Sequence, residues 1–257
     1  MLQNRRDVLT IASRALAVQA SVGLVGGSAH GRTPGRRIKA IAFDAFTIFN
    51  ILSVDAVIDA YFPGRGEALG GAWRARQFEY SWLRTLSRTY IDFWRVTEDA
   101  LVFACKAAKI ELTTAVRQEL MNAYLALKVW PDSLAALSAM QAGGIRLAYL
   151  SNMTAAMMKA NNDQAALTGL FEHALSTDAV RAFKPDPRAY QMAESAFNLP
   201  RENIMFAAFG GWDAAGAVSF GLETFWVNRL NSQPEELGVQ PNAIGMTLTE
   251  LANHVLA

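Results

Sequence analysis

The sequence of 257 residues contains one cysteine, Cys105, and three scattered histidines, His30, His173 and His254. A single cysteine cannot form an intramolecular disulfide or a cysteine-based zinc cluster. Three distant histidines give no indication of a histidine-rich metal site. The chemistry of this protein is therefore expected to depend on carboxylates, hydroxyls, amides and a few cations.

Long charged runs and long apolar runs are also absent. The net charge is +1 without an extended basic segment, so the composition does not indicate nucleic acid binding. Hydrophobic residues make up 52% of the sequence and charged residues 18%, which favours a substantial core over disorder. The length favours one large domain, or a core with a smaller insert.

Residues 1–37 have the features of an export signal followed by a flexible leader. Arg5 and Arg6 precede a weakly apolar stretch, residues 8–27, that is too polar to remain in a bilayer as a spanning helix. Small residues at positions 27–29 offer a cleavage site. The segment resembles a twin-arginine signal, which exports folded proteins. We expect a periplasmic protein; the alternative is an amphipathic N-terminus on a cytoplasmic one.

After this leader, short apolar runs alternate with helical periodicity. Residues 38–43 are typical of a strand that is buried on both faces of a parallel sheet. Further strands are predicted at 145–150, 204–208 and 222–227, and helices at about 132–142, 154–167, 187–197 and 212–220. This alternation predicts right-handed βαβ units and a Rossmann-like α/β core, formed by residues 38–52 and 129–257.

Residues 53–128 interrupt the alternation. Their apolar residues recur at spacings of three and four, which predicts almost continuous helix to about residue 127. The part from residue 73 to residue 90 is dense in aromatic residues and arginines. We therefore predict a helical cap, inserted after the first strand of the core.

Polar side chains occur where predicted strands end and in one proline-containing loop. They are Asp44 and Thr47, Ser151 and Asn152, Lys184, and Asp213. Open α/β sheets bind ligands at the carboxyl ends of their strands, so these groups could converge on one small anionic substrate. Each of them alone has a structural interpretation as a helix cap or a turn residue. Their joint placement favours a site.

The expected roles follow from the chemistry of the side chains. Asp44 would be the nucleophile. Lys184 would keep Asp44 ionised and offset the repulsion of an incoming anion. Asp213 could hold Lys184 or orient a water molecule.

Four short motifs resemble those of the haloacid dehalogenase (HAD) superfamily. They are Phe43-Asp44-Ala45-Phe46, Leu150-Ser151-Asn152, Phe183-Lys184-Pro185 and Trp212-Asp213. Within the insert, residues 61–66 (YFPGRG) and 73–84 (WRARQFEYSWLR) resemble type II L-2-haloacid dehalogenases, and this longer run is the more specific signal. The resemblance extends from about residue 38 to the C-terminus. It implies the HAD fold with a helical cap.

The resemblance also implies a reaction, the hydrolytic dehalogenation of a short 2-haloacid. The Asp44 carboxylate would displace the halide from carbon in an SN2 step and form an ester. Water would then hydrolyse the ester and release the 2-hydroxy acid with inverted configuration. The implied partners are the haloacid, water and the halide product, with no metal and no other cofactor. Residues 78–86 could mediate homodimerisation, since exposed aromatic helix faces seek partners.

Further residues match family positions that contact the substrate or the halide. Arg74 matches the cap arginine that receives the halide, and its guanidinium is permanently charged and weakly hydrated. Ser151 and neighbouring backbone N–H groups would hold the substrate carboxylate, with Asn152 near the halide. The remaining matches are Tyr190 beside Lys184, then Ala45, Phe46 and Thr47 in the nucleophile loop, and Phe78, Phe93 and Trp212 as apolar walls. For these walls, ordinary core packing is the alternative.

A phosphatase is the main alternative function. Phosphatases of this superfamily carry a second aspartate two positions after the nucleophile, and here Phe46 takes that position and cannot transfer a proton. They also hold Mg²⁺ with several carboxylates, whereas only Asp44 and Asp213 lie at matching positions. A third alternative is a catalytically inactive receptor for carboxylic acids. The presence of Asp44, Arg74 and Lys184 argues against it.

The sequence departs from the usual dehalogenase pattern in three places. The nucleophile loop usually reads Asp-Ala-Tyr-Gly-Thr, and this sequence lacks the glycine before Thr47. Ala208 and Gly210 stand where the fourth motif has serine and asparagine, which help to place the hydrolytic water. Ala75 replaces the glutamine after the cap arginine. We expect an altered pocket with a shifted preference among haloacids.

Overall fold

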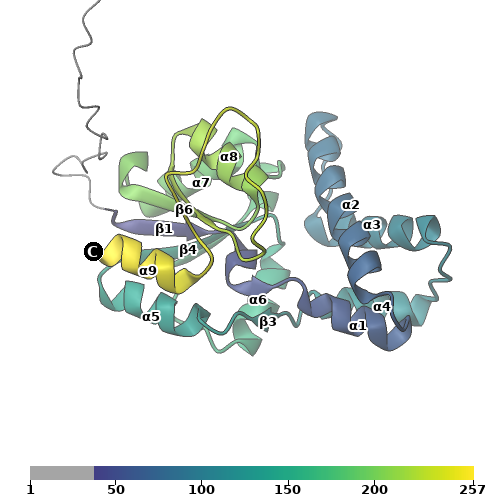
Figure 1. The fold of residues 1–257 in the computed structure, drawn as a ribbon. Coiled ribbons are helices and arrows are strands. Elements are labelled where there is room, and N and C mark those ends of the chain that lie inside the picture. The colour runs from purple at the N-terminus through teal and green to yellow at the C-terminus, as the bar shows by residue number, and fades with distance from the viewer. Residues whose placement is uncertain (1–37) are drawn as a thin grey trace, which may run out of the picture. The chain divides into compact units, whose positions relative to one another are not determined.

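The computed structural model describes residues 38–257, shown in colour in Figure 1. The predicted export signal and leader, residues 1–37, lie outside the described residues. Among residues 38–257, no helix is both long enough and apolar enough to cross a membrane.

Six parallel strands form the central sheet, in the spatial order β5-β4-β1-β6-β7-β8. The strands are β1 (Ala40–Phe43), β4 (Arg146–Ser151), β5 (His173–Ser176), β6 (Ile204–Ala208), β7 (Glu223–Val227) and β8 (Ala243–Gly245). The central strand, β1, pairs with β4 on one side and β6 on the other, so that Phe43 aligns with Tyr149 and Ala207. All residues of β1 are fully buried, as expected for a strand that is covered on both faces.

Alternate side chains of β1 face two different layers of helices. Ile41 and Phe43 belong to an apolar cluster that includes residues of α5, α6 and α9, whereas Ala40 and Ala42 pack with residues of α7 and α8. These helices are α5 (Ser133–Ala142), α6 (Ala155–Gln164), α7 (Pro187–Phe197), α8 (Gly211–Phe220) and α9 (Leu248–Leu256). In Figure 1, α5 and α9 lie below the sheet and α7 and α8 above it. The predicted α/β architecture is confirmed.

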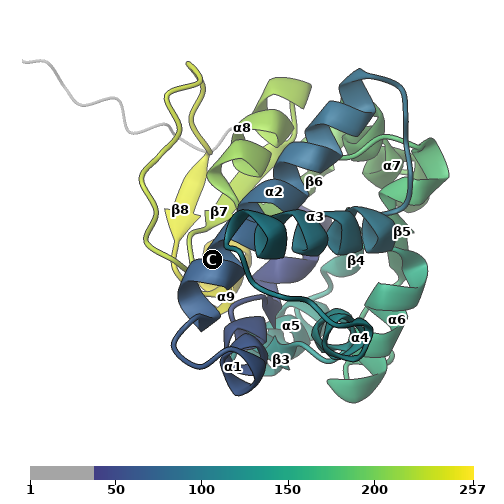
Figure 2. The same ribbon diagram turned by 90° about the vertical axis from the view of Figure 1, so that its right-hand side faces the viewer.

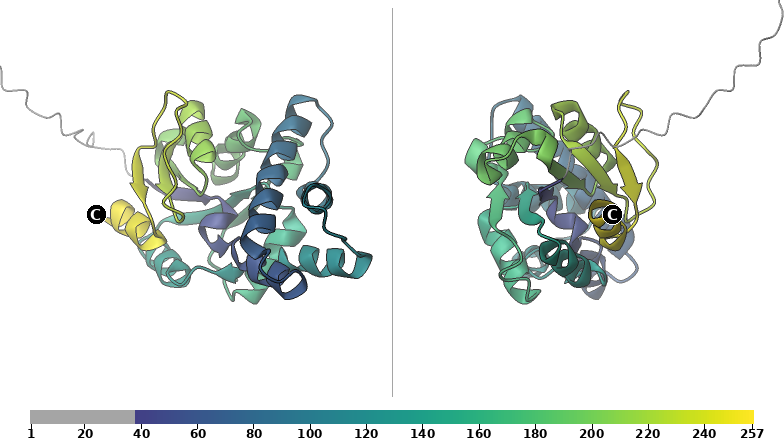
Figure 3. Two further views of the ribbon diagram at one scale, coloured as in Figure 1. Left: turned by 45° about the vertical axis from the view of Figure 1, so that its right-hand side comes forward. Right: turned by 90° about the vertical axis from the view of Figure 1, so that its left-hand side faces the viewer.

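Four helices occupy the predicted insert. They are α1 (Ser53–Tyr61), α2 (Gly66–Leu86), α3 (Phe93–Ala107) and α4 (Thr114–Ala123), between the two-residue strands β2 (Phe49–Asn50) and β3 (Lys128–Val129). Because β2 and β3 pair antiparallel, the segment that leaves the core and the segment that returns to it lie side by side. Helices α2 and α3 pack together and lie next to each other in Figure 2. Figure 3 shows α9 beside α5, away from these helices.

The expectation of almost continuous helix through the insert is wrong in detail. Asp92 and Thr113 begin new helices, because their side chains accept hydrogen bonds from the backbone N–H groups of Arg95 and Val116. Such capping competes with continuation of the preceding helix. Three short 3₁₀ helices occur in the core, η1 (Ala45–Thr47), η2 (Thr177–Val180) and η3 (Arg201–Asn203). The assignment of the insert as a separate domain stays a prediction.

Candidate active site

The strand ends bring the predicted polar residues together. Asp44 directly follows β1, Ser151 ends β4, and Asp213 lies in the first turn of α8, which follows β6. Because β1 lies between β4 and β6, the three chain segments meet at the same edge of the sheet. This is the edge at which open α/β sheets bind their ligands.

A lysine joins the two carboxylates at the centre of this edge. Lys184 Nζ donates hydrogen bonds to Asp44 Oδ2 at 2.7 Å and to Asp213 Oδ2 at 2.6 Å. Tyr190 completes the cluster, because its hydroxyl donates to Asp213 Oδ1 at 2.6 Å. Lys184 and Asp213 are fully buried, and Asp44 is 6% exposed. Buried charges require partners of this kind, and only Asp44 retains an opening to solvent.

For Lys184 and Asp213, burial and the opposite charge of the partner shift the pKa in opposite directions. Burial alone would lower the pKa of Lys184, but the charges of Asp213 and Asp44 outweigh it and raise that pKa. Burial raises the pKa of Asp213 to about 7; the Lys184 charge opposes this rise, and the Asp44 charge adds to it. Burial also raises the pKa of Tyr190, so its hydroxyl remains a donor. At neutral pH, Asp213 can therefore either hold or release a proton.

The shortened nucleophile loop forms the helix η1. Asp44 caps it, because Oδ1 accepts a hydrogen bond from Phe46 N at 2.7 Å. The Thr47 hydroxyl donates to the Asp44 carbonyl oxygen at 2.7 Å and is fully buried. Together with Lys184, these contacts give each carboxylate oxygen of Asp44 one donor. In this arrangement the Thr47 side chain holds the loop, and its predicted contact with substrate stays a prediction.

Arg229, two residues after the end of β7, holds the same loop. Its Nε and Nη2 atoms donate to the Thr47 carbonyl oxygen at 3.1 and 2.7 Å, and its Nη1 contacts Asp132 Oδ1 at 2.6 Å. The guanidinium also lies over the ring of Trp130, whose Nε1 donates to the Phe46 carbonyl at 3.1 Å. These residues lie outside the motifs that indicate a site in the sequence. Arg229 follows a predicted strand within two residues, and that position is the signal that could have identified it.

Ser151 and Asn152 lie beside the cluster and are both buried. Ser151 Oγ accepts a hydrogen bond from Met153 N at 3.1 Å. Asn152 Oδ1 accepts one from Lys184 N at 3.0 Å and one from the Thr177 hydroxyl at 3.4 Å. Asn152 therefore positions the backbone that carries Lys184. Its predicted place near the halide stays a prediction.

On the cap side, Arg74 of α2 forms an ion pair with Asp55 of α1. Arg74 Nη1 lies 2.5 Å from Asp55 Oδ1, and Nη2 lies 3.3 Å from Oδ2. The exposed side-chain fractions are 15% for Arg74 and 19% for Asp55. Gly70 provides the space, since a Cβ there would lie 2.0 Å from Asp55 Oδ1. A glycine inside a helix costs roughly 0.5–1 kcal/mol relative to alanine, and here it permits the close approach of the carboxylate.

Aromatic side chains connect the cap with the core. The Trp212 ring lies 5.3 Å from those of both Phe78 and Trp82, between centroids. Phe93 is fully buried and packs against Phe183 at 5.9 Å. Phe78 and Trp212 are thus in contact across the two parts of the chain. Phe93 of α3 therefore packs against the residue that directly precedes Lys184 in the sequence.

The position of the Trp212 indole explains why residue 210 is a glycine. A Cβ at Gly210 would lie 2.6 Å from Trp212 Nε1, so a side chain at this position is incompatible with the observed placement of the indole. The neighbouring Phe209 ring contacts Phe46 at 6.0 Å with an edge-to-face geometry. Aromatic packing therefore takes the space where the family pattern has an asparagine, and Ala208 is fully buried beside it.

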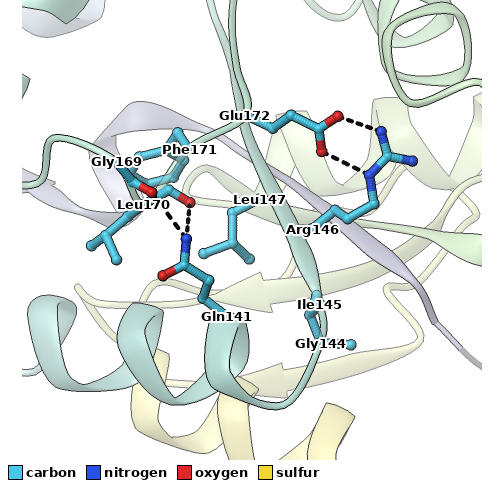
Figure 4. A pocket seen from close by; sticks show the side chains of 9 residues that line it. All are labelled: Gln141, Gly144, Ile145, Arg146, Leu147, Gly169, Leu170, Phe171 and Glu172. Carbon is cyan, nitrogen blue, oxygen red and sulfur yellow. Dashed lines mark hydrogen bonds and ion pairs between the residues drawn. The ribbon is translucent and has the colours of Figure 1, made fainter.

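A cavity of about 340 Å³ lies at the opposite edge of the sheet. Its lining comes from the beginning of β4 and from the segment before β5, so it faces the amino ends of the strands. Figure 4 shows the Arg146–Glu172 ion pair and the Gln141 amide, which donates to the carbonyls of Gly169 and Leu170. This cavity is separate from the acidic cluster. Among residues 38–257, no group of three or more histidine, cysteine or acidic side chains could hold a metal ion.

The fold and the cluster define the class of this protein, an α/β protein with a Rossmann-like parallel sheet and a buried aspartate–lysine–aspartate cluster at its strand ends. The profile of the haloacid dehalogenase-like hydrolase family matches residues 36–221. The chain therefore belongs to this family.

Within and around this family, the chain is similar to individual dehalogenases and to their solved structures. The chain is 41% identical to an (S)-2-haloacid dehalogenase of Pseudomonas sp. (strain YL) over 206 residues, covering 80% of this chain and 89% of the relative. It is 38% identical to haloacetate dehalogenase H-2 of Moraxella sp. (strain B), covering 80% and 93%. The solved L-2-haloacid dehalogenase of Xanthobacter autotrophicus with chloropropionic acid covalently bound is similar, with a TM-score of 0.80 and 30% identity, covering 85% of this chain and 98% of that one.

Proposed function

We propose that this protein hydrolyses short 2-haloacids to 2-hydroxy acids through an ester on Asp44. The observation that carries the proposal is the buried Lys184, which holds Asp44 and Asp213 together at the strand ends. The proposal is supported by the relatives, which are named haloacid and haloacetate dehalogenases. A further support is Phe46, a buried apolar side chain at the position where a phosphatase of this superfamily carries its acid.

In the first step, a carboxylate oxygen of Asp44 attacks C2 of the haloacid. The new C–O bond forms as the carbon–halogen bond breaks, and the halide leaves with the bonding electrons. In the second step, water adds to the carboxyl carbon of Asp44 and the ester C–O bond to that carbon breaks. Asp44 is regenerated, the 2-hydroxy acid leaves, and one proton is released. Because attack on C2 occurs from the side opposite the halogen, the configuration is inverted.

The remaining residues have proposed roles in these steps. Arg74 receives the halide, and Ser151 with the N–H groups of its turn holds the substrate carboxylate. Asp213, with a pKa near neutrality, accepts the proton of the hydrolytic water. Its two oxygens already accept hydrogen bonds from Lys184 and Tyr190, but a carboxylate has further lone pairs for a water molecule.

Halide release tests the proposal directly. The purified protein is incubated in EDTA with L-2-chloropropionate or chloroacetate, and free chloride and 2-hydroxy acid are measured. We expect turnover in EDTA, and a loss of roughly a thousandfold or more in Asp44→Asn. Asp163→Asn, which removes an exposed carboxylate paired with Lys159, is the matched control and should retain full activity.

Two outcomes would replace this function with the alternatives. Mg²⁺-dependent release of phosphate from a phosphomonoester, without halide release, would identify a phosphatase. Binding of haloacids without turnover would identify a carboxylic-acid receptor. A mass increase on Asp44 after a pulse of substrate is the expected signature of the covalent ester.

We also propose that residues 1–37 export the protein to the periplasm through the twin-arginine pathway. The support is the pair Arg5-Arg6 before a weakly apolar segment. A fusion of residues 1–35 to a reporter that requires this pathway should be translocated, and the same fusion with both arginines changed to lysine should not. Retention of the unaltered fusion in the cytoplasm would indicate a cytoplasmic protein.

A further inference from the structure

The ion pair between Asp55 and Arg74 affects how strongly the proposed halide site can bind an anion. Arg74 does not face the site as a free cation, because both of its Nη atoms already contact the Asp55 carboxylate. The pair combines one positive and one negative charge at hydrogen-bond distance. A halide that approaches the guanidinium therefore meets the attraction of Arg74 and, close by, the repulsion of Asp55.

We propose that Asp55 is a positioning residue that weakens halide binding at Arg74 and so favours release of the halide product. This inference rests on the proposed function, which assigns the halide to Arg74. It adds a residue that the motifs do not select, since Asp55 lies in α1 and outside both cap segments that resemble the dehalogenases. It also predicts the sign of the effect: without the carboxylate, the site should bind halide more tightly.

The contact is built into the packing of α1 against α2. A Cβ at Gly70 would lie 2.0 Å from Asp55 Oδ1 and 3.0 Å from Arg74 Nη1, so the helix surface is open where the pair forms. A Cβ at Gly66, one turn earlier, would lie 2.4 Å from the Asp55 carbonyl oxygen. Both side chains retain some exposure, 15% for Arg74 and 19% for Asp55. The pair is thus held in one geometry and remains accessible to a small anion.

The negative charge of Asp55 should have a large effect on the binding of a halide to Arg74. Two unit charges about 4 Å apart near a protein surface interact by much more than thermal energy. Removal of the Asp55 charge leaves the positive charge of the guanidinium without a neighbouring negative charge. An asparagine at position 55 preserves an oxygen acceptor for Nη1. We expect the dissociation constant of chloride to fall about tenfold in Asp55→Asn.

The experiment measures chloride binding to the full chain without haloacid, from the broadening of the ³⁵Cl resonance. The variants are Asp55→Asn and, as a second removal of the charge, Asp55→Ser. The matched control is Asp99→Asn, because Asp99 of α3 pairs with another arginine of α2, Arg84, at 3.1 Å. We expect tighter chloride binding in both Asp55 variants, no change in Asp99→Asn, and no gain when Arg74→Ala is combined with Asp55→Asn.

In turnover assays, chloride should inhibit Asp55→Asn at about tenfold lower concentration than the wild-type protein. Unchanged chloride affinity in both Asp55 variants, with normal thermal unfolding, would overturn the proposal. So would a gain that persists without Arg74. Failure of the proposed function is a different result, namely no halide release from any haloacid by the wild-type protein, and the binding experiment does not depend on it.

Discussion

At the scale of single residues, the buried lysine is the feature that organises the site. Lys184 is fully buried, and its ammonium charge is compensated by two carboxylates at 2.6 and 2.7 Å and by the Phe206 ring, whose centroid lies 4.9 Å away. The three groups are interdependent, because each of them would be an unpaired or repelling charge without the others. A Phe-Lys-Pro turn taken alone does not indicate these partners, since such turns are common on surfaces. Only its joint placement with Asp44 and Asp213 leads to the expectation that the three groups meet.

Lys184→Met should therefore destabilise the protein strongly. The substitution leaves Asp44 and Asp213 close together without a cation, and we expect the free energy of unfolding to fall by about 3–5 kcal/mol. Urea unfolding at pH 7 measures this change. Lys159→Met is the control, because the Lys159 side chain is 76% exposed in its ion pair and should have little effect. Equal stabilities of the two variants would show that the buried cluster does not contribute as described.

Hydrolysis of the ester should depend on the ionisation of Asp213. In the free protein the pKa of Asp213 is raised to about 7 by burial and by the Asp44 charge, and the Lys184 charge opposes this rise. The ester removes the Asp44 charge, so in single-turnover experiments the rate of ester decay should rise with pH to a plateau, with a midpoint below 7. Formation of the ester should lack this midpoint. If the midpoint persists in Asp213→Asn, a group other than Asp213 controls it.

At the scale of elements, the nucleophile loop shows how the chain accommodates the missing glycine. The loop forms a single 3₁₀ turn, capped by Asp44 and closed by the Thr47 hydroxyl. Arg229 and Trp130 then donate hydrogen bonds to the carbonyls of Thr47 and Phe46 from outside the loop. The position of Asp44, the proposed nucleophile, is thus fixed by contacts with residues far away in the sequence.

Loss of this contact should affect activity as well as stability. In Arg229→Ala, the Thr47 carbonyl loses both of its guanidinium donors, and we expect about 1–3 kcal/mol lower stability and at least about tenfold slower ester formation. Arg201→Ala is the matched control. Arg201 contacts a carboxylate, Glu194, and the Phe220 carbonyl at 2.6 Å, away from the strand-end site. The control should lose stability alone; equal rates of ester formation in both variants would contradict a positioning role of Arg229.

At the scale of the whole molecule, α2 presents an apolar strip to solvent. Leu83 is 57% exposed and Leu86 is 81% exposed, in the same segment that carries Trp82. Such strips favour association between chains. The predicted homodimer through residues 78–86 stays a prediction, and these exposures support it.

Sedimentation of two leucine variants tests the dimer. The wild-type protein should sediment as a dimer at micromolar concentration, and Leu86→Glu should sediment as a monomer because a charge would be buried at the interface. Leu237→Glu is the control, since Leu237 is 63% exposed outside the helices and should leave the dimer intact. A wild-type monomer would rule out this interface.

Much of the architecture could be predicted from local patterns. The apolar run at 38–43 and the strands that begin near 145, 204 and 222 are present where expected, because strands buried on both faces leave a continuous apolar signal. No element was predicted for β5, β8 or α9. β5 and β8 are edge strands with partly exposed residues, whose signal is weak. The breaks within the cap were missed because capping by Asp92 and Thr113 depends on single polar residues.

The sequence by itself determined the family, the parallel core and the polar residues at the strand ends, since these follow from short motifs and hydrophobic periodicity. Only the tertiary structure decided what those residues contact. It joined Lys184 to two carboxylates, paired Arg74 with Asp55, set Trp212 over Gly210 and placed Arg229 on the nucleophile loop. The physical reason is that charge pairing and close packing depend on distances between residues far apart in the chain, and no local pattern encodes those distances.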